Sequence, residues 1–258
     1  MTTPPDSERR VAVVTGGAMG IGAEVCRRLA AAGHQVLVAD IHIDAAQSTA
    51  QSLCADNGRA VALWMDVGSA ASITQAFDRV ERDHGRCDIL VNCAGIAKVF
   101  PFLDFPLDNF VATMQINVTG TLLCAQAAAH LMLRRRWGRI VNIASVAGMR
   151  AVGSGRTAYG TSKGAVIALT RQMAVELAEH GITANAVAPG PVDTPMTQAL
   201  HSERFRQAYA QAIPMNRYGT PGEIAAAVMY LVSEDAGYVS GTVLPVDGGF
   251  LAAGARGL

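Results

Sequence analysis

Residues 11–22 read Val-Ala-Val-Val-Thr-Gly-Gly-Ala-Met-Gly-Ile-Gly, an apolar, β-branched run that ends in a cluster of glycines. The apolar part, which begins at residue 10, is typical of a parallel strand buried on both faces. Residues 23–32 favour a helix that Gly33 ends, and residues 35–40 are a second apolar run. This order predicts a mononucleotide-binding unit, because small residues let backbone N–H groups approach a pyrophosphate at a helix N-terminus.

Asp40 ends the second apolar run. At the tip of a strand, its carboxylate can accept hydrogen bonds from both ribose hydroxyls of adenosine. It would also repel the 2′-phosphate of NADP, and no Arg or Lys stands at Gly17, Ala18, Ile41 or Ile43 to receive that phosphate. We therefore expect NAD(H) to be preferred over NADP(H). The alternative is that Asp40 is an ordinary helix cap or a solvated turn aspartate.

The alternation of strand and helix continues along the chain. Further strands are expected at residues 60–65, 88–92, 138–144, 182–188 and 240–246, and helices at residues 43–56, 69–84, 107–136, 165–177 and from residue 221. Residues 107–136 form one helix or two, and residues 196–217 are a polar, helix-prone insertion. No second domain or internal repeat is evident, so the pattern predicts one α/β domain.

Polar and small residues stand where several of these strands end. Because ligands of such sheets bind at the carboxyl edge, Asp66 and Val67 are placed to meet an adenine. Residues 92–95, Asn-Cys-Ala-Gly, are placed to form the floor of a cofactor site. The alternative is that these residues simply terminate their strands.

Tyr159 and Lys163 stand four residues apart at the head of a helical run, so their side chains share a face. A free phenol has a pKa of about 10, and a nearby positive charge lowers it. The pair could therefore exchange protons with an alcohol or a carbonyl. Ser145 ends the preceding strand. The same spacing also arises by chance in ordinary helices, so the pair needs the rest of a site around it.

The charge balance and the cysteines restrict the class of protein. The 258 residues include 21 acidic and 21 basic ones, so no broad attraction to nucleic acid or to an anionic membrane is expected, and the partner is a small molecule. The five cysteines are scattered and form no C-x-x-C pair, so neither disulfides nor a metal site are expected. Residues 1–9 read as a flexible tail rather than a signal peptide. No apolar run reaches membrane-spanning length without a polar interruption, and we expect a soluble, cytoplasmic protein.

Taken together, the motifs resemble those of the single-domain short-chain dehydrogenases/reductases. The resemblance covers residues 11–249 and rests on motifs in the expected order: TGGAMGIG at 15–22, NCAG at 92–95, Asn117, Ser145, and Tyr159-x-x-x-Lys163, with Pro189-Gly190 behind them. One departure is Cys93, where the family more often has a second Asn, and it concerns the cofactor floor rather than the reacting groups.

The resemblance implies a fold and an assembly. It implies a Rossmann-like, doubly wound sheet of seven parallel strands in the order 3-2-1-4-5-6-7, with helices on both faces. The domain would span residues 10–258, with a substrate lid at about 196–217. Family members are usually homotetramers, built through the helices that carry Asn117 and Tyr159 and through the C-terminal strand.

The resemblance also implies roles for individual residues. Tyr159 would be the acid/base, Ser145 would orient and polarise the substrate oxygen, and Lys163 would lower the Tyr pKa and bind the nicotinamide ribose. Asn117 would hold a water that links Lys163 to solvent, and Thr194 would bind the nicotinamide carboxamide. The expected cofactor contacts are Gly16, Met19, Gly20, Ile21, Asp40, Asp66, Val67, Asn92, Ala94, Gly95, Tyr159, Lys163, Pro189, Gly190, Val192 and Thr194.

We therefore predict an NAD(H)-dependent dehydrogenase/reductase that acts on CH–OH groups and interconverts a secondary alcohol and a ketone. One alternative is a 3-oxoacyl-carrier-protein reductase of fatty-acid synthesis, which shares the motifs but usually prefers NADPH, so that Asp40 argues against it. It also needs a basic docking patch, which Arg150 and Arg156 supply only in part. A second alternative is a catalytically idle NAD-binding sensor or scaffold, against which the intact acid/base residues argue.

The expected substrate pocket is mainly apolar. Its candidate residues are Ile96, Val146, Met149, Met196, Leu200 and Met215, which could equally be plain packing. Arg150 or Arg156 could pair with an anionic group of the substrate, or either could be a solvated loop arginine. His201 is expected to be a surface residue.

Overall fold

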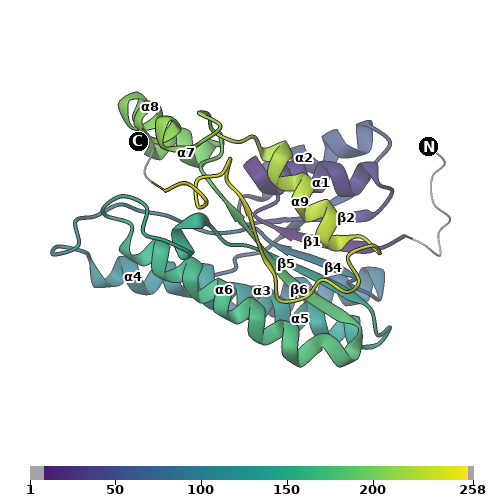
Figure 1. The fold of residues 1–258 in the computed structure, drawn as a ribbon. Helices are drawn as coiled ribbons and strands as arrows, with labels where there is room; N and C mark the ends of the chain where they lie inside the picture. Colours follow the sequence, from purple (N-terminus) through teal and green to yellow (C-terminus); the bar gives the residue numbers. More distant parts are fainter. Residues whose placement is uncertain (1–8, 255–258) are drawn as a thin grey trace.

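Seven strands form one sheet at the centre of the molecule in the computed structural model, which describes residues 9–254 (Figure 1). Every pair is parallel, and the order β3-β2-β1-β4-β5-β6-β7 confirms the prediction. The strands are β1 (Val11–Thr15), β2 (Gln35–Asp40), β3 (Arg59–Trp64), β4 (Ile89–Asn92), β5 (Gly138–Ile143), β6 (Ile182–Pro189) and β7 (Val243–Val246). The chain order reverses between β1 and β4, which opens a crevice at the carboxyl edge. Most of the predicted tail, residues 1–8, lies outside the described residues.

Helices cover both faces of the sheet, which is why the central strands are apolar throughout. One face packs against α1 (Gly20–Ala31), α2 (Ile43–Ala55) and α9 (Pro221–Val232), and the other against α3 (Ala70–His84), α5 (Gly120–Leu133) and α6 (Thr157–Leu177). Alternate residues of β1 serve the two sides: Val14 packs toward α1, and Val13 toward α3 and α5. The two layers are visible above and below the sheet in Figure 1.

The helix expected at residues 107–136 is continuous but changes its winding. It consists of α4 (Leu107–Met114), a π-helical segment η2 (Gln115–Thr119) and α5, and Asn117 lies at the centre of the π-helical segment. Such segments often occur at functional sites. By length and composition alone, Leu107–Leu133 could cross a membrane, with a mean hydropathy of 1.3 over an 18-residue window, although polar residues such as Gln115 and Asn117 interrupt it, as expected. Half of this window is buried inside the protein, as in the core helix of a globular domain.

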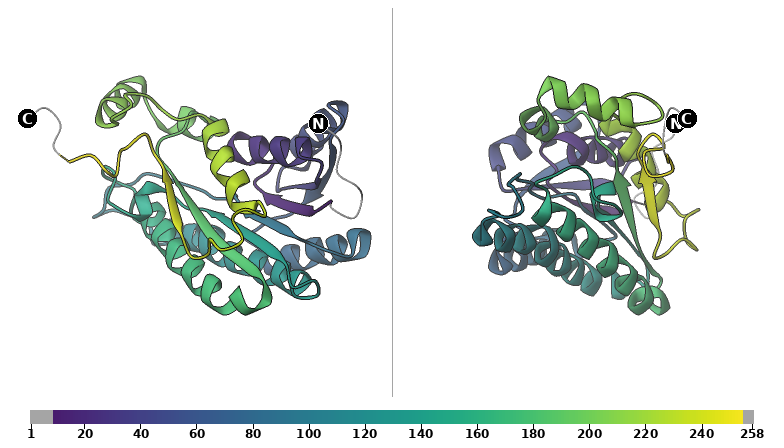
Figure 2. Two further views of the ribbon diagram at one scale, coloured as in Figure 1. Left: turned by 45° about the vertical axis from the view of Figure 1, so that its right-hand side comes forward. Right: turned by 60° about the vertical axis from the view of Figure 1, so that its left-hand side comes forward.

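The predicted insertion forms two short helices, α7 (Pro195–Leu200) and α8 (Glu203–Ala212). Figures 1 and 2 show them at one end of the molecule, beyond α1 and α9. Thr194 begins α7, because its hydroxyl accepts a hydrogen bond from the Thr197 amide while the Thr197 hydroxyl accepts one from the Thr194 amide. Ser202 caps α8 by accepting a single hydrogen bond from the Phe205 amide. We call residues 195–212 the lid.

Candidate active site

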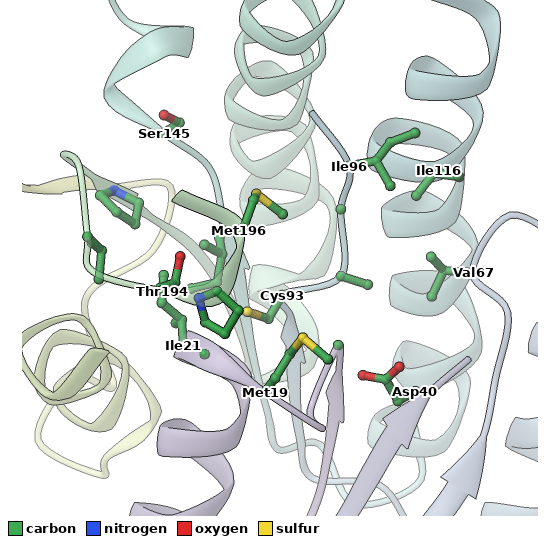
Figure 3. Close-up of a pocket in the computed structure, with 18 of the residues that line it drawn as sticks. Met19, Ile21, Asp40, Val67, Cys93, Ile96, Ile116, Ser145, Thr194 and Met196 are labelled. Atoms are coloured by element: carbon green, nitrogen blue, oxygen red, sulfur yellow. The ribbon is translucent and has the colours of Figure 1, made fainter. Parts of the chain in front are cut away.

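One cavity of about 410 Å³ lies at the carboxyl edge of the sheet. Strand ends and the residues that follow them supply most of its wall, including Gly16 after β1, Asp40 at the end of β2 and Ser145 after β5. The lid contributes Met196 and Thr197. Figure 3 shows Asp40 and Val67 at one end of the cavity and Ser145 at the other.

The glycine turn is shaped by close backbone contacts. Gly16 has a φ of +63°, and a Cβ there would lie 2.9 Å from the backbone of Ala94, so the turn packs directly on the loop after β4. A Cβ on Gly22 would lie 2.0 Å from the carbonyl oxygen of Gly16. Helix α1 begins at Gly20 without a side-chain cap, so its first N–H groups remain available at the cavity wall. This arrangement fits a pyrophosphate of a dinucleotide cofactor.

Asp40 has a structural contact on each carboxylate oxygen. One oxygen accepts a hydrogen bond from the Ala18 amide at 3.1 Å, and the other accepts one from the His42 amide at 3.0 Å. Asp40 is 8% exposed and lines the cavity. Asp40 therefore holds the glycine turn to the end of β2, which is the structural role that the alternative interpretation, a turn aspartate, assigns to it. Its carboxylate also faces the cavity, where it can meet a ligand. Within the described part of the chain, Lys163 is the only Lys or Arg on the cavity wall.

The floor of the cavity depends on a residue that the sequence analysis did not single out. The Thr15 hydroxyl accepts hydrogen bonds from the amides of Cys93 at 3.1 Å and Ala94 at 3.2 Å, and so ties β1 to the loop after β4. Asn92 was expected there, but its side chain donates to Asn142 Oδ1 at 2.9 Å inside the sheet and does not reach the cavity. The Thr at the start of the glycine motif was the available signal for this role.

Tyr159 and Ser145 meet at the opposite end. Burial raises the pKa of Tyr159, while a hydrogen bond from Ser145 and the charge of Arg156 lower it. Ser145 Oγ also accepts a hydrogen bond from the Ala147 amide at 3.1 Å, which holds it at the end of β5. The resemblance attributes the lowering to Lys163, but here it comes from Ser145 and Arg156, and Lys163 Nζ lies 5.8 Å from the centre of the Tyr159 ring.

Lys163 is held beneath Tyr159. Its ammonium donates to the carbonyl of Ile143 at 2.6 Å, and burial lowers its pKa to about 8. Because Lys163 and Tyr159 lie one turn apart on α6, they share the cavity wall, as predicted from their spacing.

Asn117 lies behind the cavity wall rather than on it. Its Oδ1 accepts from the Ile96 amide at 2.8 Å, and its Nδ2 donates to the Ile96 carbonyl and the Ser162 hydroxyl, each at 3.0 Å. A Cβ on Gly95 would lie 3.1 Å from Asn117 Oδ1 and 3.6 Å from Lys163 Nζ, so Gly95 separates the two side chains. Asn117 therefore joins the loop after β4 to α6, and its role in holding a water stays a prediction.

The structure brings the expected cofactor contacts together with one exception. All of them except Asn92 line the cavity, although the Thr194 hydroxyl also caps α7. Cys93, expected in the floor, also lines the cavity. The wall further includes residues that the sequence analysis did not assign to it: Ile41, His42, Met65, Ile116, Ile143, Ala144, Pro195 and Thr197.

Only some of the residues expected in the substrate pocket line the cavity. Ile96 and Met196 line the cavity. Val146 is wrong as a pocket residue, because it is buried in a small cluster with Ile213 and Phe250. Met149 and Leu200 are exposed away from the wall, and Met215 lines a second, separate cavity near Asp247. His201, expected at the surface, lies within the lid at the end of α7 and is only 7% exposed.

The chain is similar to known oxidoreductases over nearly its whole length. The model of a family described as enoyl-(acyl carrier protein) reductase matches residues 16–251. The 3-oxoacyl-[acyl-carrier-protein] reductase FabG of Aquifex aeolicus is 39% identical over 241 residues, which are 93% of this chain and 96% of that protein.

Two crystal structures show the same fold. A short-chain type dehydrogenase/reductase from Mycobacterium marinum has a TM-score of 0.91 and 36% identity, with 95% of this chain and 96% of that one covered. A gluconate 5-dehydrogenase from Burkholderia cenocepacia, in complex with NADP and tartrate, has a TM-score of 0.91 and 34% identity at the same coverage.

Proposed function

Because the chain belongs to the short-chain dehydrogenase/reductase family of oxidoreductases, we propose that it uses NAD(H) to interconvert a secondary alcohol and a ketone, with Tyr159 as the acid/base. The observation that carries the proposal is the placing of Tyr159 beside Ser145 and above Lys163, on the wall of the cavity that the glycine turn closes at its other end. A protein that only binds a nucleotide has no need of this acid/base arrangement.

Oxidation of the alcohol removes a hydride from carbon and a proton from oxygen. NAD⁺, when bound, supplies the acceptor for the hydride. The Tyr159 phenolate takes the hydroxyl proton, and in the reverse direction the Tyr159 phenol gives a proton to the carbonyl oxygen. Ser145 donates a hydrogen bond to the substrate oxygen as its charge develops, which is the role of an oxyanion site.

Lys163 supplies the electrostatic support for this proton transfer. Its ammonium lies in the same buried space as the phenol, and its hydrogen bond to the Ile143 carbonyl keeps it in place. In the proposed mechanism this positive charge favours the phenolate over the phenol, in addition to the contributions of Ser145 and Arg156 that lower the pKa of Tyr159.

The preference for NAD(H) rests on Asp40. Its charge faces the end of the cavity where Val67 and Asp66 lie, and no Arg or Lys accompanies it there among residues 9–254. The gluconate 5-dehydrogenase that shares the fold was crystallised with NADP. The fold is therefore compatible with NADP, and the proposed preference for NAD(H) depends on Asp40 at this end of the cavity.

A second candidate is reduction of a 3-oxoacyl thioester on a carrier protein. The name of the Aquifex aeolicus relative favours it. The description of the matching family also names an acyl carrier protein, but for reduction of an enoyl group. The acid/base chemistry would be the same, because a 3-oxoacyl group is also a ketone. Asp40 disfavours it, since the resemblance leads us to expect NADPH for that reaction.

Replacement of Tyr159 by Phe tests the proposal. The variant removes the transferable proton, and we expect kcat for a panel of polyols, hydroxysteroids, cyclic alcohols and acyl thioesters to fall by about 10²–10⁴-fold. NADH binding, measured by fluorescence titration, should stay unchanged. Tyr238→Phe is the matched control, because Tyr238 is fully exposed. Retained kcat in Tyr159→Phe would contradict the mechanism, and NADH binding without turnover by the unmodified protein would favour the sensor.

A further inference from the structure

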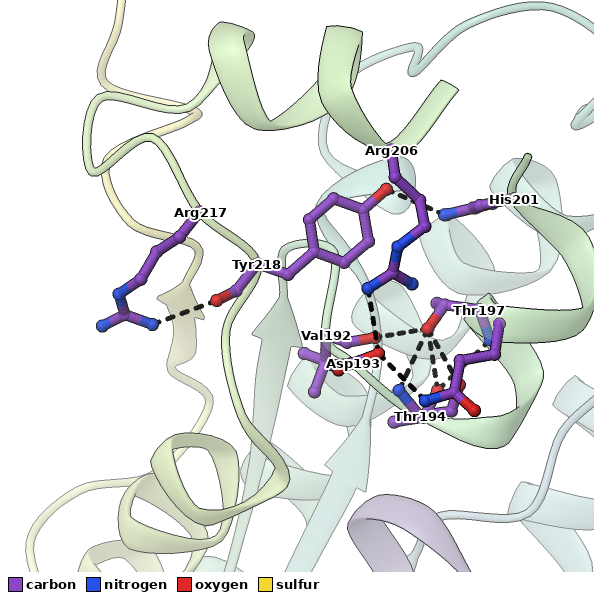
Figure 4. Close-up of polar contacts among 9 residues, drawn as sticks. Val192, Asp193, Thr194, Thr197, His201, Arg206, Arg217 and Tyr218 are labelled. Carbon is purple, nitrogen blue, oxygen red and sulfur yellow. Dashed lines mark hydrogen bonds and ion pairs between the residues drawn. The ribbon is translucent and has the colours of Figure 1, made fainter. Parts of the chain in front are cut away.

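Arg156 lies at the junction of the catalytic helix and the lid. It is the N-cap residue of α6, one turn before Tyr159. Its Nη2 lies 2.8 Å from Nε2 of His201, the residue that ends α7, and Nδ1 of His201 lies 3.0 Å from the Tyr218 hydroxyl. Figure 4 shows the contact between His201 and Tyr218 under the lid.

The protonation of His201 follows from these contacts. A guanidinium can only donate, so Nε2 of His201 accepts from Arg156, and Nδ1–H donates to the Tyr218 oxygen. Burial lowers the pKa of His201 to about 4, and the charges of Arg156 and Arg206 act in the same direction. His201 is therefore neutral at physiological pH and orients the Arg156 guanidinium without adding charge.

Arg156 has no acidic partner in the part of the chain that the structure describes. Two other arginines in and just after the lid are neutralised: Arg206 pairs with Asp193 at 3.0 Å (Figure 4), and Arg217 pairs with Glu223 at 2.6 Å. The guanidinium of Arg156 instead lies 5.8 Å from the centre of the Phe205 ring.

The surroundings of Arg156 are aromatic. Phe205, Tyr209 and Tyr218 pack edge to face with centroid separations of 5.5 and 6.1 Å, and His201 stacks against them. The Arg156 guanidinium is thus half-buried between His201 and the Phe205 ring, and no carboxylate within residues 9–254 pairs with it, so its charge is available to an anion.

The position of Arg156 also connects it to the reacting groups. Its charge lowers the pKa of both Tyr159 and Tyr209, which places it within electrostatic reach of both phenols. His201 ends helix α7 of the lid, and two residues of the same helix, Met196 and Thr197, line the cavity. Arg156 itself is not on the wall of the cavity, so a substrate whose C–O group meets Tyr159 would reach it by extending past Met196 and Thr197 toward the lid.

We propose that Arg156 binds a carboxylate of the substrate, so that the substrate is a hydroxy acid or the corresponding oxo acid. This inference rests on the proposed alcohol–ketone chemistry and names its substrate class. One N–H of the guanidinium is used by His201, and no other side-chain hydrogen bond of Arg156 falls within residues 9–254. The planar guanidinium retains further donors with the geometry that a carboxylate matches.

The test compares each acid with its uncharged ester. Wild-type enzyme and Arg156→Met are assayed with 2-, 3- and 4-hydroxy acids and their methyl esters, with NAD⁺. We expect wild type to prefer at least one acid over its ester. Arg156→Met should lose about 10- to 100-fold more in kcat/KM for that acid than for its ester, from the usual strength of a hydrogen bond to a charged group. The loss should fall mainly on KM, because the carboxylate is bound equally before and during hydride transfer.

Two further variants serve as controls. Arg150→Met removes a neighbouring loop arginine that lies over Phe250 at 5.1 Å, and it should leave the preference for the acid unchanged. Arg156→Lys keeps the charge without the planar fork and should recover part of the loss.

Direct binding separates this inference from the proposed reaction. Saturation-transfer NMR with butanoate and butanamide, in the presence of NAD⁺, should show a butanoate signal that Arg156→Met abolishes and a butanamide signal that it does not change. Equal loss of acid and ester turnover in Arg156→Met, or no preference of wild type for any acid, would overturn the inference, as would butanoate binding that Arg156→Met leaves intact. If the wild-type enzyme turns over none of these substrates but binds butanoate, and Arg156→Met abolishes that binding, the result would count against the proposed reaction and support the carboxylate site.

Discussion

Replacing Asp40 by Asn should narrow the enzyme's discrimination between NAD(H) and NADP(H). The carboxylate is 8% exposed, and its oxygens accept from the amides of Ala18 and His42 at 3.1 and 3.0 Å. Asparagine keeps the shape of the side chain and removes its charge. Its single carbonyl oxygen can serve one of the two amides, so the glycine turn retains part of its support.

The expected size follows from the repulsion between the carboxylate and a 2′-phosphate. Two like charges about 4 Å apart repel by about 1 kcal/mol in water and by about 4 kcal/mol near a protein surface. Asp40 lies between these environments, because it is largely buried but faces an open cavity. Each 1.4 kcal/mol changes such a ratio tenfold, so the ratio of kcat/KM for NAD⁺ to kcat/KM for NADP⁺ should fall by about 5- to 1000-fold.

The assay measures kcat/KM for both cofactors at a fixed concentration of one alcohol, in wild type, Asp40→Asn and Asp40→Ala. Asp44→Asn is the control, because Asp44 is an exposed acid in the first turn of α2 and has no place in the cavity wall. Urea unfolding reports the structural part of the change. Asp40→Asn should lose about 1–3 kcal/mol of unfolding free energy, since one buried amide is left without its acceptor.

Three results would refute this reasoning. A preference of wild type for NADP(H) would show that Asp40 does not exclude the 2′-phosphate. An unchanged cofactor ratio in Asp40→Asn, with wild-type stability, would show that the carboxylate faces neither the ribose nor the phosphate. An equal shift in Asp44→Asn would assign the effect to general charge rather than to the strand end.

Two other predictions follow from the contacts of the site. Burial raises the pKa of Tyr159, so kcat for alcohol oxidation, which needs the phenolate, should rise into the alkaline range, while kcat for ketone reduction, which needs the phenol, should be flat near neutrality. Ser145→Ala removes a hydrogen bond that lowers this pKa, so it should move the midpoint of the oxidation profile to higher pH. A shift to lower pH, or no shift, would contradict the assigned hydrogen bond. Asn117→Ala should lower the free energy of unfolding, measured in urea, by about 2–5 kcal/mol. The reason is that Ile96 loses hydrogen-bond partners for both its amide and its carbonyl, and the Ser162 hydroxyl loses a donor. A loss below about 1 kcal/mol would show that the π-helical segment does not depend on these bonds.

Much of the site could be predicted from local patterns. The patterns at residues 11–22 and 35–40 predicted a strand, a turn, a helix and a second strand. They could do so because hydrophobic period, glycine content and chain order are properties of the local sequence. The positions of Asp40, Asp66 and Ser145 followed from one rule, that parallel strands present their carboxyl ends at the same edge. The order of the seven strands came from the family resemblance, and the structure confirms it.

Side-chain direction could not be predicted in this way. Asn92 and Thr15 both end strands, yet Asn92 bonds to Asn142 inside the sheet while Thr15 bonds to the cavity floor. Val146 follows Ser145 directly and points instead into a separate cluster. Which face a strand-end residue presents depends on the neighbouring strands and helices, and these come from distant parts of the sequence.

The sequence by itself determined that the chain is an α/β domain with a glycine turn, an acid at the second strand end and a Tyr–Lys pair on one helix face, because each of these depends on spacing along the chain. Only the tertiary structure decided what surrounds them. Arg156 and His201 are 45 residues apart, and the fold alone places the neutral imidazole against the unpaired guanidinium beside Tyr159. Charge, burial and hydrogen-bond partners are properties of the assembled neighbourhood, and these three determine whether an arginine near the catalytic helix is a surface residue or a receptor for an anion.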